Sequence, residues 1–120
     1  QTPNFKMIFG DVELKNDTTA KGMWKTTKGG ALRATSSGGS STGYRAGNIG
    51  IKGFSGAMII DDPLKPDDAN SKVKMEYINN RYENTFKSRL AKEDIPIIVI
   101  MQRIHPLDFT NHLISEYGKE

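Results

Sequence analysis

Two short apolar runs stand out in the chain, at residues 57–60 and residues 96–101. Continuous runs of this length are typical of strands that are buried on both faces, as in parallel sheets. Between the runs, apolar residues recur at spacings of three and four, which predicts one long helix over residues 69–90. The apolar positions of this helix are Met75, Ile78, Tyr82, Phe86 and Leu90. A shorter helix is predicted over residues 107–117, because Gly118 follows as a stop signal.

The order strand, helix, strand, helix predicts a parallel α/β sheet with right-handed crossovers. The N-terminal part has a different pattern. Residues 22–26 and 31–35 flank Gly29 and Gly30, which predicts a β-hairpin. The side chains expected to pack in this hairpin are Met23, Trp24, Leu32 and Ala34. Residues 5–14 are expected to be irregular or a short strand, and the Ser- and Gly-rich residues 36–43 are expected to form a loop.

Composition narrows the class of protein. A length of 120 residues predicts a single domain, residues 1–120, and 36% hydrophobic residues allow a modest core. The absence of cysteine excludes disulfides and thiolate metal sites. A net charge of +3 is compatible with nucleic-acid binding but is too small to indicate it alone. Both apolar runs are too short to cross a bilayer, so no membrane contact is predicted.

The first apolar run ends in two acids, Asp61 and Asp62, followed by Pro63. Side chains alternate along a strand, so adjacent acids serve one site only where the strand ends and the chain turns. Ligand sites of α/β sheets lie at the carboxyl ends of strands. In P-loop NTPases an acid at such an end holds Mg²⁺, and a neighbouring acid orients the attacking water. An ordinary Asp-Asp-Pro turn is the equally weighted alternative.

The glycine-rich loop does not supply a phosphate cradle. Gly38 and Gly43 have the spacing of G-x-x-x-x-G-K-[ST], but Tyr44 and Arg45 occupy the Lys and Ser/Thr positions. Without that Lys, the β- and γ-phosphates lose a main contact. No other stretch of the chain fits the motif.

Three further groups of polar residues are candidates. Gln102 and Arg103 follow the second apolar run, a position from which they could contact a γ-phosphate. The alternative for Arg103 is an ordinary surface cation at a strand end. Arg45 and Lys52 precede the acidic strand and could stabilise phosphate charge, including charge on a neighbouring subunit, although solvated surface charge is the simpler interpretation. The two histidines, His105 and His112, have no third ligand at metal spacing.

Taken together, these segments resemble the ATPase region of the large subunit of phage terminases, the motor that packages viral DNA. The similarity covers most of the chain in the family's order. The matching segments are Gly22-Met23-Trp24-Lys25-Thr26, Gly29-Gly30, Ser41-Thr42-Gly43, residues 57–63, Lys65, Ala69, Ser71, Ser88-Arg89-Leu90, residues 97–103, His105 and Asp108.

The resemblance implies an α/β fold, a partial RecA-like P-loop NTPase sheet with flanking helices and a β-hairpin. It implies ATP and Mg²⁺ as cofactors, with Asp61 as the metal-binding Walker B acid and Asp62 as the catalytic acid. Asp62 stands where many relatives have Glu, so it reaches about 1.5 Å less far. Gln102 and Arg103 match the positions that couple ATP state to DNA movement. Lys52 with Gly53, or Arg45, takes the place of the family's Arg-Gly.

The family's phosphate-binding loop lies upstream of this region and its nuclease domain downstream, so the resemblance implies the C-terminal part of a terminase ATPase domain. It further implies double-stranded DNA, the terminase small subunit and the portal protein as partners, a homo-oligomer when full length, and the cytoplasm of an infected host. Two other classes stay open. One is a metal-dependent nuclease that uses Asp61, Asp62 and Asp108, and the other is a non-catalytic interaction domain.

Overall fold

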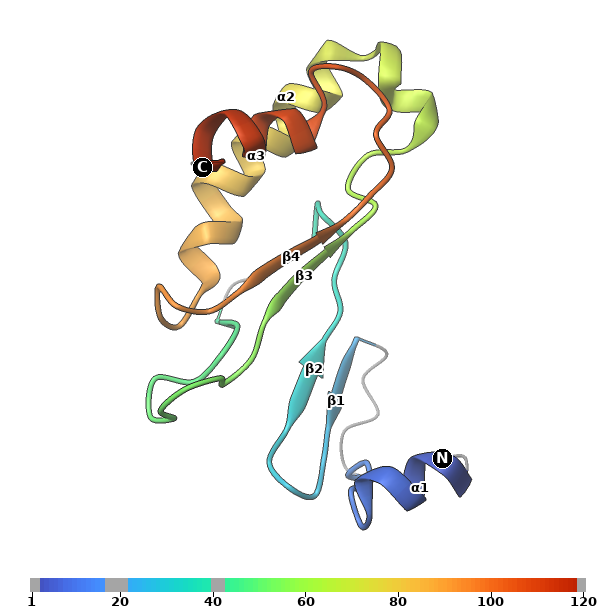
Figure 1. Ribbon diagram of the computed structural model, residues 1–120, viewed down its shortest axis with the longest axis vertical. Coiled ribbons are helices and arrows are strands. Elements are labelled where there is room, and N and C mark those ends of the chain that lie inside the picture. Colours follow the sequence, from blue (N-terminus) through green and yellow to red (C-terminus); the bar gives the residue numbers. More distant parts are fainter. Residues whose placement is uncertain (1–2, 17–21, 40–42, 119–120) are drawn as a thin grey trace. The chain divides into compact units, whose positions relative to one another are not determined.

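The computed structural model describes residues 3–16, 22–39 and 43–118 of the chain (Figure 1). The chain folds as two compact units, Gln1–Gly39 and Ser40–Glu120. Across the described residues it is mixed α/β, with three α-helices and two two-stranded sheets, which confirms the predicted α/β class at this level. None of these helices is both long and apolar enough to span a membrane.

The first unit contains the predicted hairpin. Strands β1 (Met23–Lys25) and β2 (Ala31–Arg33) pair antiparallel, with Trp24 opposite Leu32. The turn closes because the Thr26 amide donates to the Gly30 carbonyl at 2.8 Å, and Gly29 takes a φ of +88° that favours glycine. The expectation that these side chains are packed is wrong for Leu32, which is 55% exposed, and Trp24 is also exposed.

The start of the first unit is helical, which corrects the expectation of an irregular segment or short strand for residues 5–9. Residues 10–14 are irregular as expected, and Leu14 forms a bridge with Thr26. Helix α1 spans Pro3–Phe9. Proline suits the first helical position because its φ is already helical and its missing amide has no partner there. The helix stops before Gly10, which has a φ of +59° and donates its amide to the Lys6 carbonyl at 2.9 Å. Periodicity did not detect a helix this short.

The second unit is built on a parallel strand pair, as predicted. Strands β3 (Met58–Asp61) and β4 (Ile97–Ile100) run side by side and end at the same edge (Figure 1). Met58 pairs with Ile97 and Asp61 with Ile100. The expected Ser- and Gly-rich loop falls partly on residues 40–42, which lie outside the described residues.

The connection from β3 to β4 is helical over almost the predicted span of residues 69–90. A 3-10 turn η1 (Pro66–Asn70) leads into α2 (Lys72–Arg81), which continues through a π turn η2 (Tyr82–Phe86) and a 3-10 turn η3 (Lys87–Arg89). The hydroxyl of Ser71 caps α2 by accepting the Lys74 amide. After β4, helix α3 (Phe109–Tyr117) returns along α2 (Figure 1).

The core lies between the strand pair and the two helices. It joins one strand residue, the loop after it, α2, η2 and α3 through Ile60, Leu64, Met75, Ile78, Tyr82 and Phe109. The opposite side of the strand pair is exposed: Ile59 is 59% and Ile100 54% accessible. The apolar runs therefore predicted the strands correctly, but burial on both faces is wrong for the described part of the chain. Among the described residues, helices cover one face of the strand pair.

Candidate functional site

The acid pair stands where β3 ends. Asp61 is the last residue of the strand, and the Asp62 amide donates to the Ile100 carbonyl at 2.9 Å. Among the described residues, Asp62 is the one non-glycine residue with a positive φ, at 41°. A left-handed conformation costs a residue with a Cβ about 1–2 kcal/mol, although Asp tolerates it better than most. The turn at Asp62 breaks the strand's alternation, so both exposed carboxylates lie at one strand end.

Gln102 and Arg103 follow β4 at the same edge, because the strands are parallel and Asp61 pairs with Ile100. Both residues are exposed. The Arg103 Nε donates to Asp108 Oδ2 at 3.0 Å, which leaves the two terminal nitrogens of the guanidinium outside that bond. The structure therefore brings the four residues predicted from the two strand ends to one edge of the sheet.

Asp108 organises the segment after Arg103, a role that was not predicted from the sequence. Its carboxylate is fully buried, with Oδ2 accepting the Ile104 amide at 3.0 Å and Oδ1 accepting the Asn111 amide at 3.1 Å at the start of α3. Burial raises the pKa of Asp108, but the hydrogen bonds from Asn111, Ile104 and Arg103 outweigh burial and hold the pKa below its usual value. The preference of helix N-caps for Asp was the available signal.

This engagement bears on the nuclease alternative. Both carboxylate oxygens of Asp108 accept hydrogen bonds, one from the start of α3 and one from Arg103. Asp108 therefore does not serve as a third metal ligand beside Asp61 and Asp62. Across residues 3–16, 22–39 and 43–118, no three His, Cys, Asp or Glu side chains gather in a metal-binding group. The pair itself suits Mg²⁺, which protein sites hold through one or two carboxylates together with waters and substrate phosphates.

The two histidines take part in local contacts. The His105 Nδ1 accepts the Leu107 amide at 3.0 Å, and the His112 Nε2 lies 3.0 Å from Glu83 Oε1. Neither histidine lies in a group with metal-ligand spacing within the described residues.

Arg45 and Lys52 lie at the other end of the strands. Ala46 forms a bridge with Leu90, and the Lys92 Nζ donates to the Ile51 and Gly53 carbonyls at 3.1 and 3.3 Å. These partners precede β4, so the segment that carries Arg45 and Lys52 is held near the amino ends of β3 and β4. The stretch from Gly56 to Asp61 spans roughly 16 Å at the usual rise per strand residue. The structure thus does not bring Arg45 and Lys52 to the acids within one chain.

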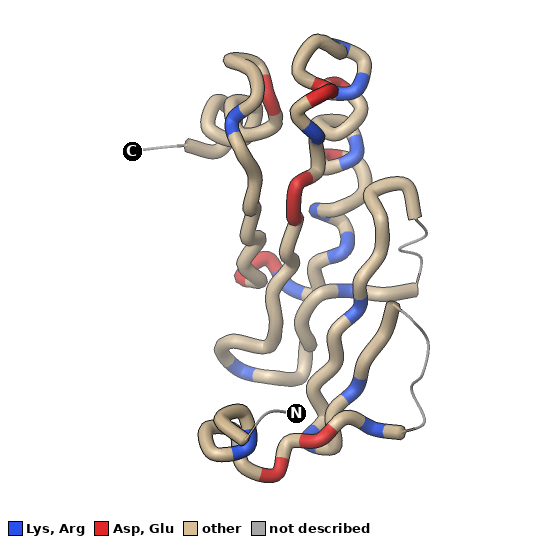
Figure 2. The backbone as a smooth tube through the Cα atoms, turned by 90° about the vertical axis from the view of Figure 1, so that its right-hand side faces the viewer, with Lys and Arg blue, Asp and Glu red and all other residues tan. Residues whose placement is uncertain are grey.

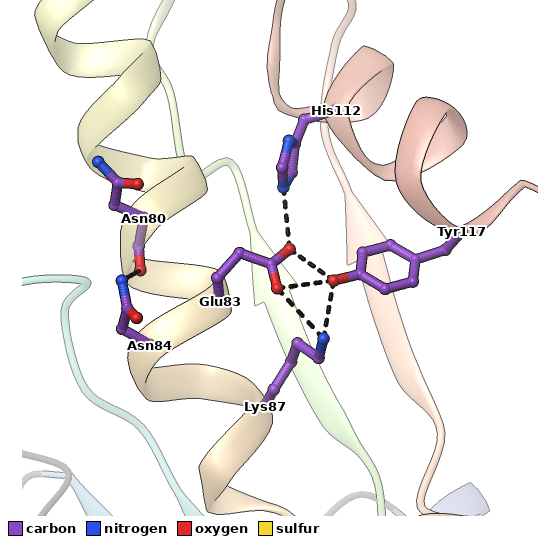
Figure 3. A network of polar contacts seen from close by, with 6 residues as sticks. All are labelled: Asn80, Glu83, Asn84, Lys87, His112 and Tyr117. Atoms are coloured by element: carbon purple, nitrogen blue, oxygen red, sulfur yellow. Dashed lines mark hydrogen bonds and ion pairs between the residues drawn. The ribbon is translucent and has the colours of Figure 1, made fainter.

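A polar network joins the helical connection to α3 (Figure 3). The Tyr117 hydroxyl lies 2.6 and 2.7 Å from the two oxygens of Glu83, Lys87 Nζ lies 3.1 Å from Oε2, and His112 approaches Oε1. Burial raises the pKa of Glu83, but hydrogen bonds from Tyr117, His112 and Lys87 hold it below its usual value. Hydrogen bonds with Tyr117 and Glu83 raise the pKa of Lys87. The network fastens η2 to α3.

Tyr117→Phe tests whether this network stabilises the fold. We expect the free energy of unfolding to fall by about 1 kcal/mol, the usual net contribution of one hydrogen bond, because the ring and its edge contact with Tyr82 remain. Urea unfolding measures the change. Tyr77→Phe is the matched control, since Tyr77 is 48% exposed and lies outside the network. Equal losses in the two variants would show that the network contributes nothing to stability.

Comparison with known proteins adds no assignment: no family model, no curated protein and no solved structure matches the chain. The function is therefore inferred from the order of the residues and from the geometry of the strand edge.

Proposed function

We propose that the chain is part of the ATPase region of a phage terminase large subunit, the ATP-driven motor that packages viral DNA. The observation that supports this most is the shared edge of β3 and β4, where the acid pair and the Gln102–Arg103 pair follow adjacent parallel strands. In the proposal, β3 and β4 are two strands of a RecA-like sheet, and the other strands and the phosphate-binding loop come from a preceding segment of the complete protein.

Each residue of the edge has a proposed role. Asp61 ends a regular strand and is exposed, so its carboxylate is available to Mg²⁺ bound with ATP. Asp62 stands one residue further on in a turned backbone, where it would orient the attacking water. When bound, ATP would supply the reacting phosphoryl group, and Mg²⁺ would neutralise part of its charge. Gln102 and Arg103 would respond to the γ-phosphate from the neighbouring strand end.

A chain of contacts could transmit a change at this edge to the part of the protein that moves DNA. Arg103 is bonded to Asp108, and Asp108 caps α3, so a shift of Arg103 would be passed to the helix. Double-stranded DNA is the proposed cargo, and the small subunit and portal protein are the proposed partners of a homo-oligomer in the host cytoplasm. Arg45 and Lys52, at the opposite strand ends, fit a contact with a neighbouring subunit better than a contact with their own acids.

The decisive experiment uses the complete gene product. A terminase ATPase requires a G-x-x-x-x-G-K-[ST] sequence before Gln1, and the purified protein should hydrolyse ATP faster when duplex DNA is added. A complete protein that lacks this phosphate-binding motif and shows no DNA-stimulated ATP hydrolysis would contradict the proposal. Incubation of the chain with plasmid and Mn²⁺ tests the nuclease alternative, because cleavage lost in Asp62→Asn would favour it.

A further inference from the structure

A cavity of about 590 Å³ lies at the amino end of β4, away from the acidic edge. The apolar part of its lining consists of Leu90, Ala91, Ile95 and Ile97. Lys87, Glu93 and Tyr117 also line the cavity and are exposed, so it opens to solvent on their side. Its volume falls within the range of roughly 300–1,000 Å³ that is usual for small-molecule sites.

Tyr82 also lines this cavity, and its hydroxyl lacks a partner. The residue is only 6% accessible, and its ring meets the rings of Phe109 and Tyr117 at centroid distances of 5.3 and 6.0 Å. A buried tyrosine hydroxyl usually finds a hydrogen-bond partner, but this one has none among the described residues. It is not one of the fully enclosed polar atoms, so a molecule in the cavity can reach it. Burial raises the pKa of Tyr82, which keeps the hydroxyl protonated and able to donate.

The charges around the cavity favour an uncharged occupant. Lys87 and Lys92 line it, but Lys87 pairs with Glu83 at 3.1 Å and Lys92 with Asp94 at 3.5 Å. Glu93 has no ion pair in the described part of the chain, so it would repel an anion, while the two ammonium groups would repel a cation. Acids and bases are equally numerous across the second unit and are spread along it (Figure 2), so the unit as a whole attracts neither sign of charge.

Water alone would be poorly held in this cavity. A water molecule takes up about 30 Å³ in the liquid and needs two to four polar partners, which the apolar wall does not provide. Replacing poorly ordered water with an apolar group is favourable. A molecule that covers the wall and also satisfies the Tyr82 hydroxyl therefore suits the cavity better than water does.

We propose that the cavity binds a small, uncharged molecule with an apolar body and one acceptor oxygen, to which the Tyr82 hydroxyl donates. The apolar body packs on Leu90, Ala91 and the two isoleucines of the wall. The rim includes Tyr117, which is held in place by its bonds with Glu83 (Figure 3). The site lies at the amino end of β4, whereas the proposed nucleotide edge lies at the carboxyl end, so it does not depend on the proposed function.

Acetophenone, which has an aromatic body and a single carbonyl oxygen, is the probe. In the full chain labelled with ¹³C at the isoleucine δ1 methyls, it should shift the Ile95 and Ile97 resonances to saturation. Exposed Ile114, on α3 and outside the lining, should stay unshifted. Tyr82→Phe removes the hydroxyl alone and should weaken binding by about fivefold, the equivalent of one net hydrogen bond. Because that hydroxyl has no partner to lose, the urea midpoint of the variant should not fall. Tyr77→Phe, outside the lining, is the matched control and should keep full affinity.

Two further comparisons test the size and the charge of the occupant. Ala91→Leu fills the cavity from its wall and should remove acetophenone binding. Benzoate and benzylammonium are an anion and a cation of similar size, and each should bind more weakly than acetophenone. Ile95 and Ile97 methyls that stay unshifted up to the solubility limit of acetophenone would mean that the cavity holds water only, which overturns the proposal. Full affinity in Tyr82→Phe, or tighter binding of benzoate, overturns it as well. Thermal unfolding verifies that Ala91→Leu is folded, and Tyr82→Phe decides the matter if it is not.

Discussion

Asp61→Asn should abolish DNA-stimulated ATP hydrolysis by the complete protein, with a loss of at least about a hundredfold. Removing a residue that only supports a metal ligand costs 10–100-fold, so removing the ligand's charge should cost no less. The amide is nearly isosteric, and Asp61 is exposed at the end of β3, so the fold should persist. Phosphate release measured over a range of Mg²⁺ concentrations, with and without duplex DNA, checks the result.

Glu76→Gln is the matched control for this variant. Glu76 is an exposed acid on α2 of the same unit, and its salt bridge with Lys72 is a solvent-exposed i,i+4 pair of small energetic weight. We expect its hydrolysis rate to equal that of the unaltered protein. Full activity in Asp61→Asn, or an equal loss in both variants, would remove Asp61 from the metal site.

Asp62→Glu distinguishes the proposed role of Asp62 from that of Asp61. If Asp62 orients the attacking water, the longer side chain should keep or raise the rate, because it restores the reach of about 1.5 Å that Asp lacks. Asp62→Asn should lower the rate while leaving nucleotide binding intact. An Asn variant as active as the unaltered protein would indicate that Asp62 matters for its left-handed turn, which Asn also adopts, and not for its carboxylate.

Asp108→Ala should lower the free energy of unfolding by about 3 kcal/mol. The loss combines the N-cap of α3, worth about 1 kcal/mol, with buried donors that are left unsatisfied at 1–3 kcal/mol each. Arg103 also loses its partner and becomes free to leave the edge. Urea unfolding at neutral pH measures the change, and a domain of this size has only about 5–15 kcal/mol to lose.

The effect of Asp108→Ala should depend on pH in a defined direction. Hydrogen bonds hold the pKa of Asp108 below its usual value of 3.8, so as the pH falls the unfolded chain takes up a proton before the folded chain does. The contribution of the charged carboxylate is therefore complete above pH 3.8 and is lost as the pH falls through the folded pKa. The difference between the variant and the unaltered chain should shrink in acid. A difference that grows in acid would contradict this assignment.

Asp67→Ala is the control for Asp108→Ala. Asp67 is an exposed acid in the first turn of η1, where substitution of a surface group should change stability by no more than about 0.5 kcal/mol. Equal destabilisation by the two substitutions would mean that the buried contacts of Asp108 contribute nothing beyond a surface charge.

The fold was largely predictable where one pattern dominated locally. The apolar runs predicted β3 and β4, and the spacing of Met75, Ile78 and Tyr82 predicted the buried face of the helical connection. Helix α1 was not predicted, because a helix of seven residues contains too few apolar positions to reveal a period. The strands are not buried on both faces, although their apolar residues had indicated it. The connecting segments decide which face a helix covers, and the strand's own residues do not.

The candidate site also contains a part that was predictable from the sequence and a part that was not. Adjacency in the sequence and a following proline were enough to place Asp61 and Asp62 at a strand end, and parallel pairing then placed Gln102 and Arg103 beside them. The networks were not predictable. Glu83 and Tyr117 are far apart in the chain, so only the packing of α3 against the helical connection brings them together.

The sequence by itself therefore determined the identity and order of the elements around the acid pair, because strand and helix signals arise from residues close together in the chain. The tertiary structure alone decided which side chains share an edge and which are satisfied. It placed Arg45 and Lys52 at the strand ends away from the acids, and it brought Tyr117 to Glu83. These contacts join residues distant in sequence, and the one-dimensional pattern carries no record of them.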